Sequence, residues 1–165
     1  MIKIEVCPGN LTPGFDKYSP ACLRKLFDGK TVSPVLDFSY DADCIDLIDK
    51  INQISVSGVQ EKLSAIVENG KITLAPTGQS GRYIIKPAPN YKHLRFREQI
   101  PANEHLTMQI AKQVYKINTA ENGLVFFANG EMAYITKRFD FDTNGNKVKQ
   151  EDFSSLAQKT VQTHG

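Results

Sequence analysis

Hydrophobic and polar residues alternate in several short stretches of the chain, which is the pattern of half-buried β-strands. The pairs Asn69-Gly70 and Asn129-Gly130 stand between neighbouring stretches, and this dipeptide favours the tight turn of a β-hairpin. The pattern therefore predicts two hairpins and one further strand that stops before Pro87. The strands are predicted at residues 62–68, 71–74, 82–86, 124–128 and 132–138.

A helical period of three to four residues appears in other parts of the chain. The first predicted helix is short: Ser19 caps it, Pro20 begins it and Gly29 closes it. The segment 91–100 is polar and basic without a clear period, so it is predicted to be a loop. The remaining helices are predicted at residues 40–52, 101–115 and 151–159.

The helix at 101–115 carries the clearest pattern. Leu106, Ile110 and Val114 lie four apart, and we expect this apolar stripe to face the core. Glu104 lies on the same apolar side, where a carboxylate needs a cation or several hydrogen-bond donors. It also stands in the first turn, where it would only stabilise the helix dipole, so both interpretations stay open. Glu104 shares its face with the residues that widen the stripe, Met108, Ala111 and Tyr115.

The order helix, hairpin, strand, helix, hairpin predicts an α+β fold in which a helix packs on an antiparallel sheet. Residues 1–38 are rich in turn-forming Pro and Gly and form a loop-rich N-terminal segment with one short helix. Residues 39–165 are predicted to form the main domain.

The composition of the chain narrows the range of functions that the protein can have. The chain has 165 residues, of which 41% are hydrophobic, and this suits one ordinary domain core. The formal net charge is only +2, so the basic surface that binds nucleic-acid phosphates is not expected. The sequence also lacks a long apolar run and a secretory signal, so neither a membrane nor nucleic acid is an expected partner, and a cytoplasmic location is predicted.

The cysteines do not form a recognisable framework. Cys7, Cys22 and Cys44 are widely spaced, without the paired CxxC motifs of a zinc site or the even number of a disulfide scaffold. They are predicted to be reduced thiols, and no metal site is expected. A zinc site built on Cys7, Cys22 and a histidine is the alternative.

Lys86 is the first candidate for chemistry, because it ends an apolar strand that would hold its ammonium group rigidly towards phosphate oxygens. A solvated strand-end lysine is the plainer interpretation. A loop with one glycine, Gly58, precedes this strand, and the helix with Glu104 follows it. This order is that of the N-terminal lobe of protein kinases. The usual GxGxxG pattern is absent, so serine hydroxyls and Lys62 are expected to help hold phosphates.

Five motifs follow one another in the chain: ISVSGVQEK at 54–62, IIKP at 84–87, NE at 103–104, RFD at 138–140 and QEDF at 150–153. In order and spacing they resemble the HipA family of bacterial serine/threonine kinases, the toxins of HipBA-type toxin–antitoxin systems. The resemblance covers residues 51–156, and the N-terminal part is most similar to the short HipT-type branch.

The resemblance implies a protein-kinase-like N-lobe, with an antiparallel sheet and a packed helix of the kinase αC type. It implies that Lys86 contacts ATP phosphates and that Glu104 is its ion-pair partner. Ser55 and Ser57 match positions of autophosphorylation, where a charge of about −1.5 to −2 would repel nucleotide phosphates. The other residues implied in ATP binding are Ser57, Gly58, Val59 and Lys62 at the phosphates and Lys137, Arg138 and Phe139 at the adenine.

A kinase also needs a catalytic aspartate and metal-binding side chains from its C-lobe. No such loop follows Asp140, so we expect an N-lobe truncated before the C-lobe, with no catalytic residue of its own and inactive alone. ATP and Mg²⁺ are expected for the intact kinase, and neither is expected to bind this chain tightly.

The resemblance also implies partners. They are the missing C-lobe, a HipB-like DNA-binding antitoxin or a HipS-like small subunit, and a protein substrate, which in this family is an aminoacyl-tRNA synthetase. The alternative is a stand-alone interaction module that binds an antitoxin or a kinase partner without chemistry.

Overall fold

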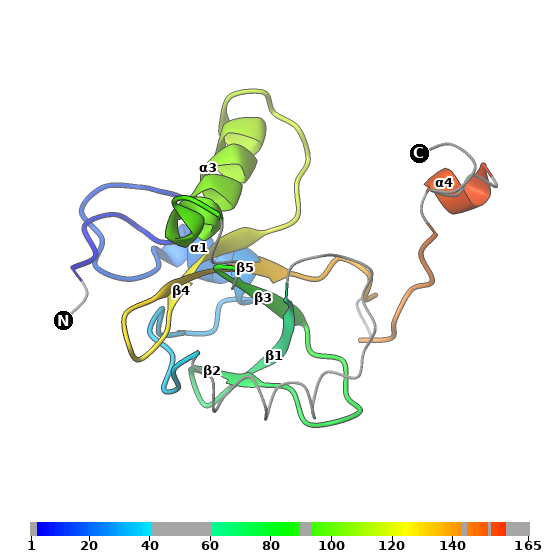
Figure 1. Cartoon of the computed structure of the whole chain (residues 1–165), viewed down its shortest axis with the longest axis horizontal. Helices are drawn as coiled ribbons and strands as arrows, with labels where there is room; N and C mark the ends of the chain where they lie inside the picture. Colours follow the sequence, from blue (N-terminus) through cyan, green and yellow to red (C-terminus); the bar gives the residue numbers. More distant parts are fainter. Residues whose placement is uncertain (1–2, 41–60, 90–93, 143–144, 152, 158–165) are drawn as a thin grey trace.

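The structure is a computed structural model that describes residues 3–40, 61–89, 94–142, 145–151 and 153–157. Within these residues, five strands form one antiparallel sheet in the order β2-β1-β3-β5-β4 (Figure 1). The predicted antiparallel sheet is thus confirmed, although β4 begins at Asn122 rather than at Leu124. The strands are β1 (Leu63–Glu68), β2 (Lys71–Leu74), β3 (Tyr83–Pro87), β4 (Asn122–Phe126) and β5 (Met132–Lys137).

The first hairpin turns as its sequence predicts. Asn69 and Gly70 have φ angles of 49° and 77°, and Glu68 pairs with Lys71 directly across the turn. Both positive φ values are those of the tight turn that Asn-Gly favours. The second hairpin is longer, because Phe127 N–H donates to Glu131 O before β5 begins.

Four helical segments lie in the described residues: α1 (Pro20–Leu26), the 3₁₀ turn η1 (Arg97–Gln99), α3 (Ile100–Gln113) and α4 (Phe153–Leu156). Helix α1 is built as predicted, since Ser19 Oγ accepts from the N–H of Cys22 at 3.2 Å and Pro20 occupies its first turn. Helix α4 lies within the predicted segment 151–159. The predicted helix at 40–52 lies almost wholly outside the described residues.

The predicted orientation of α3 is wrong. Leu106, Ile110 and Val114, which we expected in the core, are 48%, 42% and 67% exposed. The buried face is mainly polar, and it packs on the sheet because Asn122 of β4 supplies hydrogen bonds to it. The buried residues of α3 are Pro101, His105 and Gln109.

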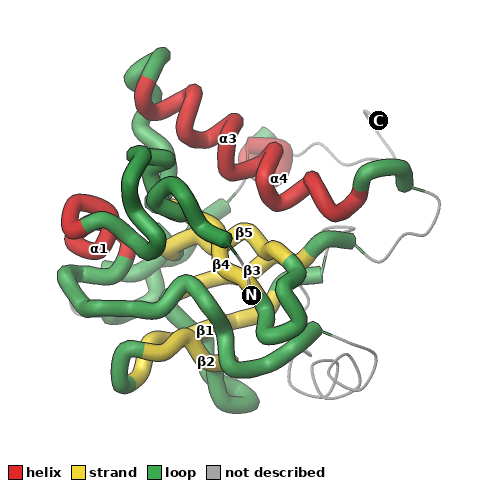
Figure 2. The backbone as a smooth tube through the Cα atoms, turned by 90° about the vertical axis from the view of Figure 1, so that its left-hand side faces the viewer, coloured by secondary structure: helices red, strands yellow, loops and turns green. Residues whose placement is uncertain are grey.

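The sheet is the middle layer of the domain. Side chains alternate along a strand, so Ile85 and Lys86 project to opposite faces. The face of Ile85 packs against the N-terminal segment, whose Leu26 and Phe27 are fully buried in the same core cluster. The face of Lys86 carries α3, which crosses β4 and β5 (Figure 2). The N-terminal segment therefore covers one face of the sheet and α3 the other.

Among the described residues, no helix is long and apolar enough to span a bilayer.

Candidate functional site

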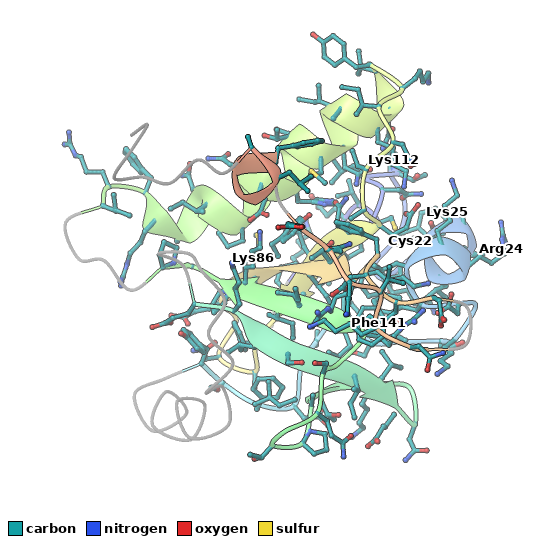
Figure 3. All side chains as sticks on the ribbon, turned by 90° about the vertical axis from the view of Figure 1, so that its right-hand side faces the viewer. Cys22, Arg24, Lys25, Lys86, Lys112 and Phe141 are labelled. Carbon is teal, nitrogen blue, oxygen red and sulfur yellow. The ribbon has the colours of Figure 1, made fainter. Side chains whose placement is uncertain are left out.

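An ion pair joins the sheet to α3. Lys86 Nζ lies 2.5 Å from Glu104 Oε1, so β3 and α3 each contribute one side of the pair. The two side chains are 23% and 27% exposed, so the ion pair is partly buried. Figure 3 shows Lys86 on the sheet beneath α3. The structure therefore brings together the two residues that the kinase resemblance pairs.

Tyr134 forms the floor beneath this pair. It stands opposite Lys86 in the β3–β5 register, and Lys86 Nζ lies 5.3 Å from the centroid of its ring. A cation over a ring face is attracted by the ring quadrupole. Burial raises the pKa of Tyr134 to about 12, so the phenol stays neutral at physiological pH. Tyr134 thus helps to hold the ammonium group in place without adding a negative charge.

Lys62 lies near the same end of the sheet. It immediately precedes β1, whose first residue, Leu63, pairs with Ile85 in the antiparallel register of β1 and β3. Lys86 directly follows Ile85, so Lys62 stands at the end of β1 that neighbours Lys86.

A buried polar network holds α3 against the sheet. Asn122 Oδ1 accepts from Nδ1 of His105 at 2.8 Å and from Nε2 of Gln109 at 3.0 Å, while its Nδ2 donates to Ala120 O at 2.8 Å. Because an amide oxygen only accepts, Nδ1 of His105 carries the proton. Burial lowers the pKa of His105, which keeps the imidazole neutral. The network sets the rotation of α3 and hence the position of Glu104, one residue before His105.

The side chains of the residues predicted at the adenine do not all project to the face of the sheet that carries Lys86. Lys137 projects to the face opposite Lys86, where its Nζ lies 2.5 Å from Asp28 Oδ1 near α1. The backbone N–H groups of Lys137 and Arg138 donate to Glu121 O and Arg82 O. Phe139 is 75% exposed. The structure therefore does not bring the side chain of Lys137 to the Lys86–Glu104 pair.

The side chain of Arg138 is held by Asp140, two residues further along the chain. Its Nε and Nη2 donate to the two carboxylate oxygens of Asp140 at 2.8 and 2.5 Å. These bonds hold the pKa of the Asp140 carboxyl below its usual range. The guanidinium groups of Arg138 and Arg82 also lie 5.1 and 5.3 Å from the ring centroid of Phe141. Both cations pack on Phe141, so they brace the segment after β5.

Some predicted residues lie outside the described part of the chain. These are the phosphate-loop residues Ser55, Ser57, Gly58 and Val59. In the part that is described, no group of three or more His, Cys, Asp or Glu side chains could hold a metal ion.

Sequence reasoning missed Tyr134, Asn122 and Phe141. Tyr134 could have been found from the alternation of its strand together with the register against Lys86. Asn122 gives no signal in the sequence, because it looks like a turn residue until the strand and the helix are seen together. The position of Phe141 between two arginines likewise depends on tertiary structure.

The fold and site define a mixed α/β domain in which a strand lysine and a helix glutamate form a partly buried ion pair. The model of the HipA-like C-terminal domain family matches residues 54–164, which is more than half of the chain. The protein therefore belongs to the HipA-like kinase family, as the resemblance predicted.

Two similar proteins give further context. A Haemophilus influenzae protein named "Putative kinase" is 35% identical over 141 residues, which cover 81% of this chain and 38% of that protein. The chain thus spans well under half the length of this relative. A protein in the Shewanella oneidensis complex of HipA, HipB and operator DNA is 25% identical, with a TM-score of 0.39 over 67% of this chain and 27% of that one.

Proposed function

We propose that this chain provides the ATP-binding N-lobe of a HipA-like serine/threonine protein kinase. The observation that carries the proposal is the 2.5 Å pair between Lys86 on β3 and Glu104 on α3. In protein kinases a strand lysine holds ATP phosphates and a helix glutamate holds the lysine, and both must be in place for activity. The antiparallel sheet with one helix on the lysine face supports the same reading.

Lys86 would act as a positioned point charge on the phosphates of ATP. Glu104 and the ring of Tyr134 restrict the ammonium group, so little freedom remains to be lost when ATP binds. Lys62, which immediately precedes β1, would also border the phosphates, as the family resemblance implies. Mg²⁺-ATP would supply the phosphoryl group, and this chain would orient it.

The adenine would lie near the segment that follows β5. The side chains of Lys137 and Arg138 are already paired with Asp28 and Asp140, so the exposed ring of Phe139 is the better candidate for a contact with the base. An exposed aromatic ring can stack on a purine. The proposed adenine contact is therefore Phe139.

We propose the wider activity from the family resemblance. The proposed kinase is the toxin of a toxin–antitoxin system, it phosphorylates a protein such as an aminoacyl-tRNA synthetase, and a HipB-like antitoxin or a HipS-like subunit binds it. The Shewanella relative forms a complex with HipB and DNA. Phosphates on Ser55 and Ser57 would weaken ATP binding by charge repulsion.

The test is phosphoryl transfer by a protein in which this chain is joined to a HipA-like catalytic lobe. Lys86→Ala should reduce the rate at least about 100-fold, because the phosphates lose their positioned cation. Lys71→Ala is the matched control, since Lys71 is also a strand lysine in an ion pair, 2.7 Å from Asp37, and lies at the far edge of the sheet. Equal rates for the two variants would reject the role of Lys86.

A second candidate function is a non-catalytic interaction module. It is favoured by the exposed apolar stripe of Leu106, Ile110 and Val114 on α3. Ile110→Glu separates the two functions. If the chain is only an interaction module, this variant should lose its partner, and Lys86→Ala should leave partner binding unchanged.

A further inference from the structure

Two cysteines meet inside the N-terminal segment. Cys7 and Cys22 are buried, unoxidised and members of the same core cluster, and Ser19 is hydrogen-bonded to both. Cys7 Sγ also accepts from the N–H of Ser19 at 3.1 Å. The two cysteines therefore meet around Ser19 in the core of the N-terminal segment.

The backbone beside the two cysteines leaves room for the Cys22 sulfur atom. A Cβ on Gly9 would lie 1.9 Å from Cys22 Sγ, so only glycine leaves room for this sulfur. The Oγ of Ser19 accepts from the N–H of Cys22 at 3.2 Å, which fixes Cys22 at the start of α1. Gly9 and Ser19 thus set the positions of the two cysteines inside the segment.

A pocket gives access to the pair. It has a volume of about 390 Å³, and its lining includes Cys22, Gly9, Lys25 and Lys112. Figure 3 shows Cys22 close to Lys25 and Lys112. Cys7 is fully buried, whereas Cys22 is 6% exposed. A small oxidant in the pocket would therefore reach Cys22 first.

From this geometry we infer that Cys7 and Cys22 form a reversible disulfide when the chain meets a peroxide. The Cys22 thiol loses its proton to solvent, and its sulfur attacks a peroxide oxygen. The O–O bond breaks, hydroxide leaves, and Cys22 becomes a sulfenic acid. The Cys7 sulfur then attacks the Cys22 sulfur, the S–S bond forms, and the released hydroxide takes the thiol proton as water. The two sulfur atoms together lose two electrons and the peroxide gains them.

The disulfide would clamp the segment that supports α3 and β4. Between the two cysteines, Asn10 O accepts from Nε2 of Gln113 on α3 at 3.0 Å, and the Tyr18 hydroxyl donates to Leu124 O on β4 at 2.7 Å. A covalent link that closes this loop restricts the unfolded chain. We expect oxidation to raise the melting temperature by roughly 5–10 °C.

The test treats the Cys44→Ser chain with hydrogen peroxide, blocks free thiols with an alkylating agent and maps peptides without reduction. Removing Cys44, which lies outside the described residues, leaves a single intrachain pairing. The expected result is a Cys7–Cys22 peptide, a chain lighter by two hydrogens, and full alkylation of both cysteines after dithiothreitol treatment. Full alkylation without reduction, or a cross-link between two chains, would overturn the inference.

Single cysteine variants identify the order of events. In Cys7→Ser, Cys22 should be trapped as a sulfenic acid by dimedone, because the pocket reaches it and no second thiol resolves it. In Cys22→Ser, no intrachain link should form, and peroxide should leave the melting temperature unchanged. The wild-type chain, mapped in the same way, keeps the test independent of whether these variants fold. A wild-type map with links only to Cys44 would also overturn the inference.

Discussion

Replacing Asn122 with alanine should loosen α3 from the sheet. Asn122 is 2% exposed and makes three hydrogen bonds, to His105, Gln109 and Ala120. The substitution leaves the donors of two buried side chains without their acceptor, and each unsatisfied buried group costs about 1–3 kcal/mol. The carbonyl of Ala120 is partly exposed and can bind water instead. We therefore expect a loss of about 2–4 kcal/mol in the free energy of unfolding.

The assay is urea denaturation followed by circular dichroism, with the free energy extrapolated to zero urea. Asn103→Ala is the matched control, because Asn103 is exposed on the same helix and its replacement should change stability by less than about 0.5 kcal/mol. Leu106→Ala tests the orientation of α3, since an outward leucine should cost far less than the about 2–5 kcal/mol of a core leucine. A loss below about 0.5 kcal/mol for Asn122→Ala, or a core-sized loss for Leu106→Ala, would refute the assigned packing.

Three further predictions concern the charges of the site. A double-mutant cycle with Lys86→Met and Glu104→Gln, measured by urea denaturation, should give a coupling energy of about 0.5–1 kcal/mol, and zero coupling would mean that the pair does not order the site. Burial lowers the pKa of His105 in the folded chain. As the pH falls below about 6.5, the unfolded chain therefore binds a proton before the folded chain does. The free energy of unfolding should decrease as the pH falls through this range. This part of the slope should disappear in His105→Gln. In a protein that carries the catalytic lobe, Ser55→Glu with Ser57→Glu should weaken ATP binding in titration calorimetry, and the corresponding Gln variants should not.

Local features of the fold could be predicted because their causes lie within a few residues. Ser19 and Pro20 encode the start of α1, and Asn69-Gly70 encodes a turn with positive φ. The order of a strand lysine and a helix glutamate predicted the layout of a kinase N-lobe. The pairing of Lys86 with Glu104 was implied by the family resemblance rather than by periodicity.

The orientation of α3 could not be predicted from its own sequence. Periodicity ranks the stripe through Leu106 as the buried face, because it counts apolar residues and ignores polar partners. His105 and Gln109 are buried only because Asn122, on a different element, satisfies both. The face of the sheet to which Lys137 projects could not be predicted for a similar reason, since it depends on the register between β3 and β5.

The central claim is that Lys86 contacts the phosphates of ATP. An acyl-phosphate derivative of ATP transfers its acyl group to a lysine that lies at the phosphates, and peptide mass spectrometry then identifies that lysine. We predict that Lys86, with Lys62 beside it, is acylated and that excess Mg²⁺-ATP suppresses this labelling, while Lys71 is labelled no more than a surface lysine. Labelling suppressed by ATP at Lys25 or Lys112 instead, with none at Lys86, would contradict the account.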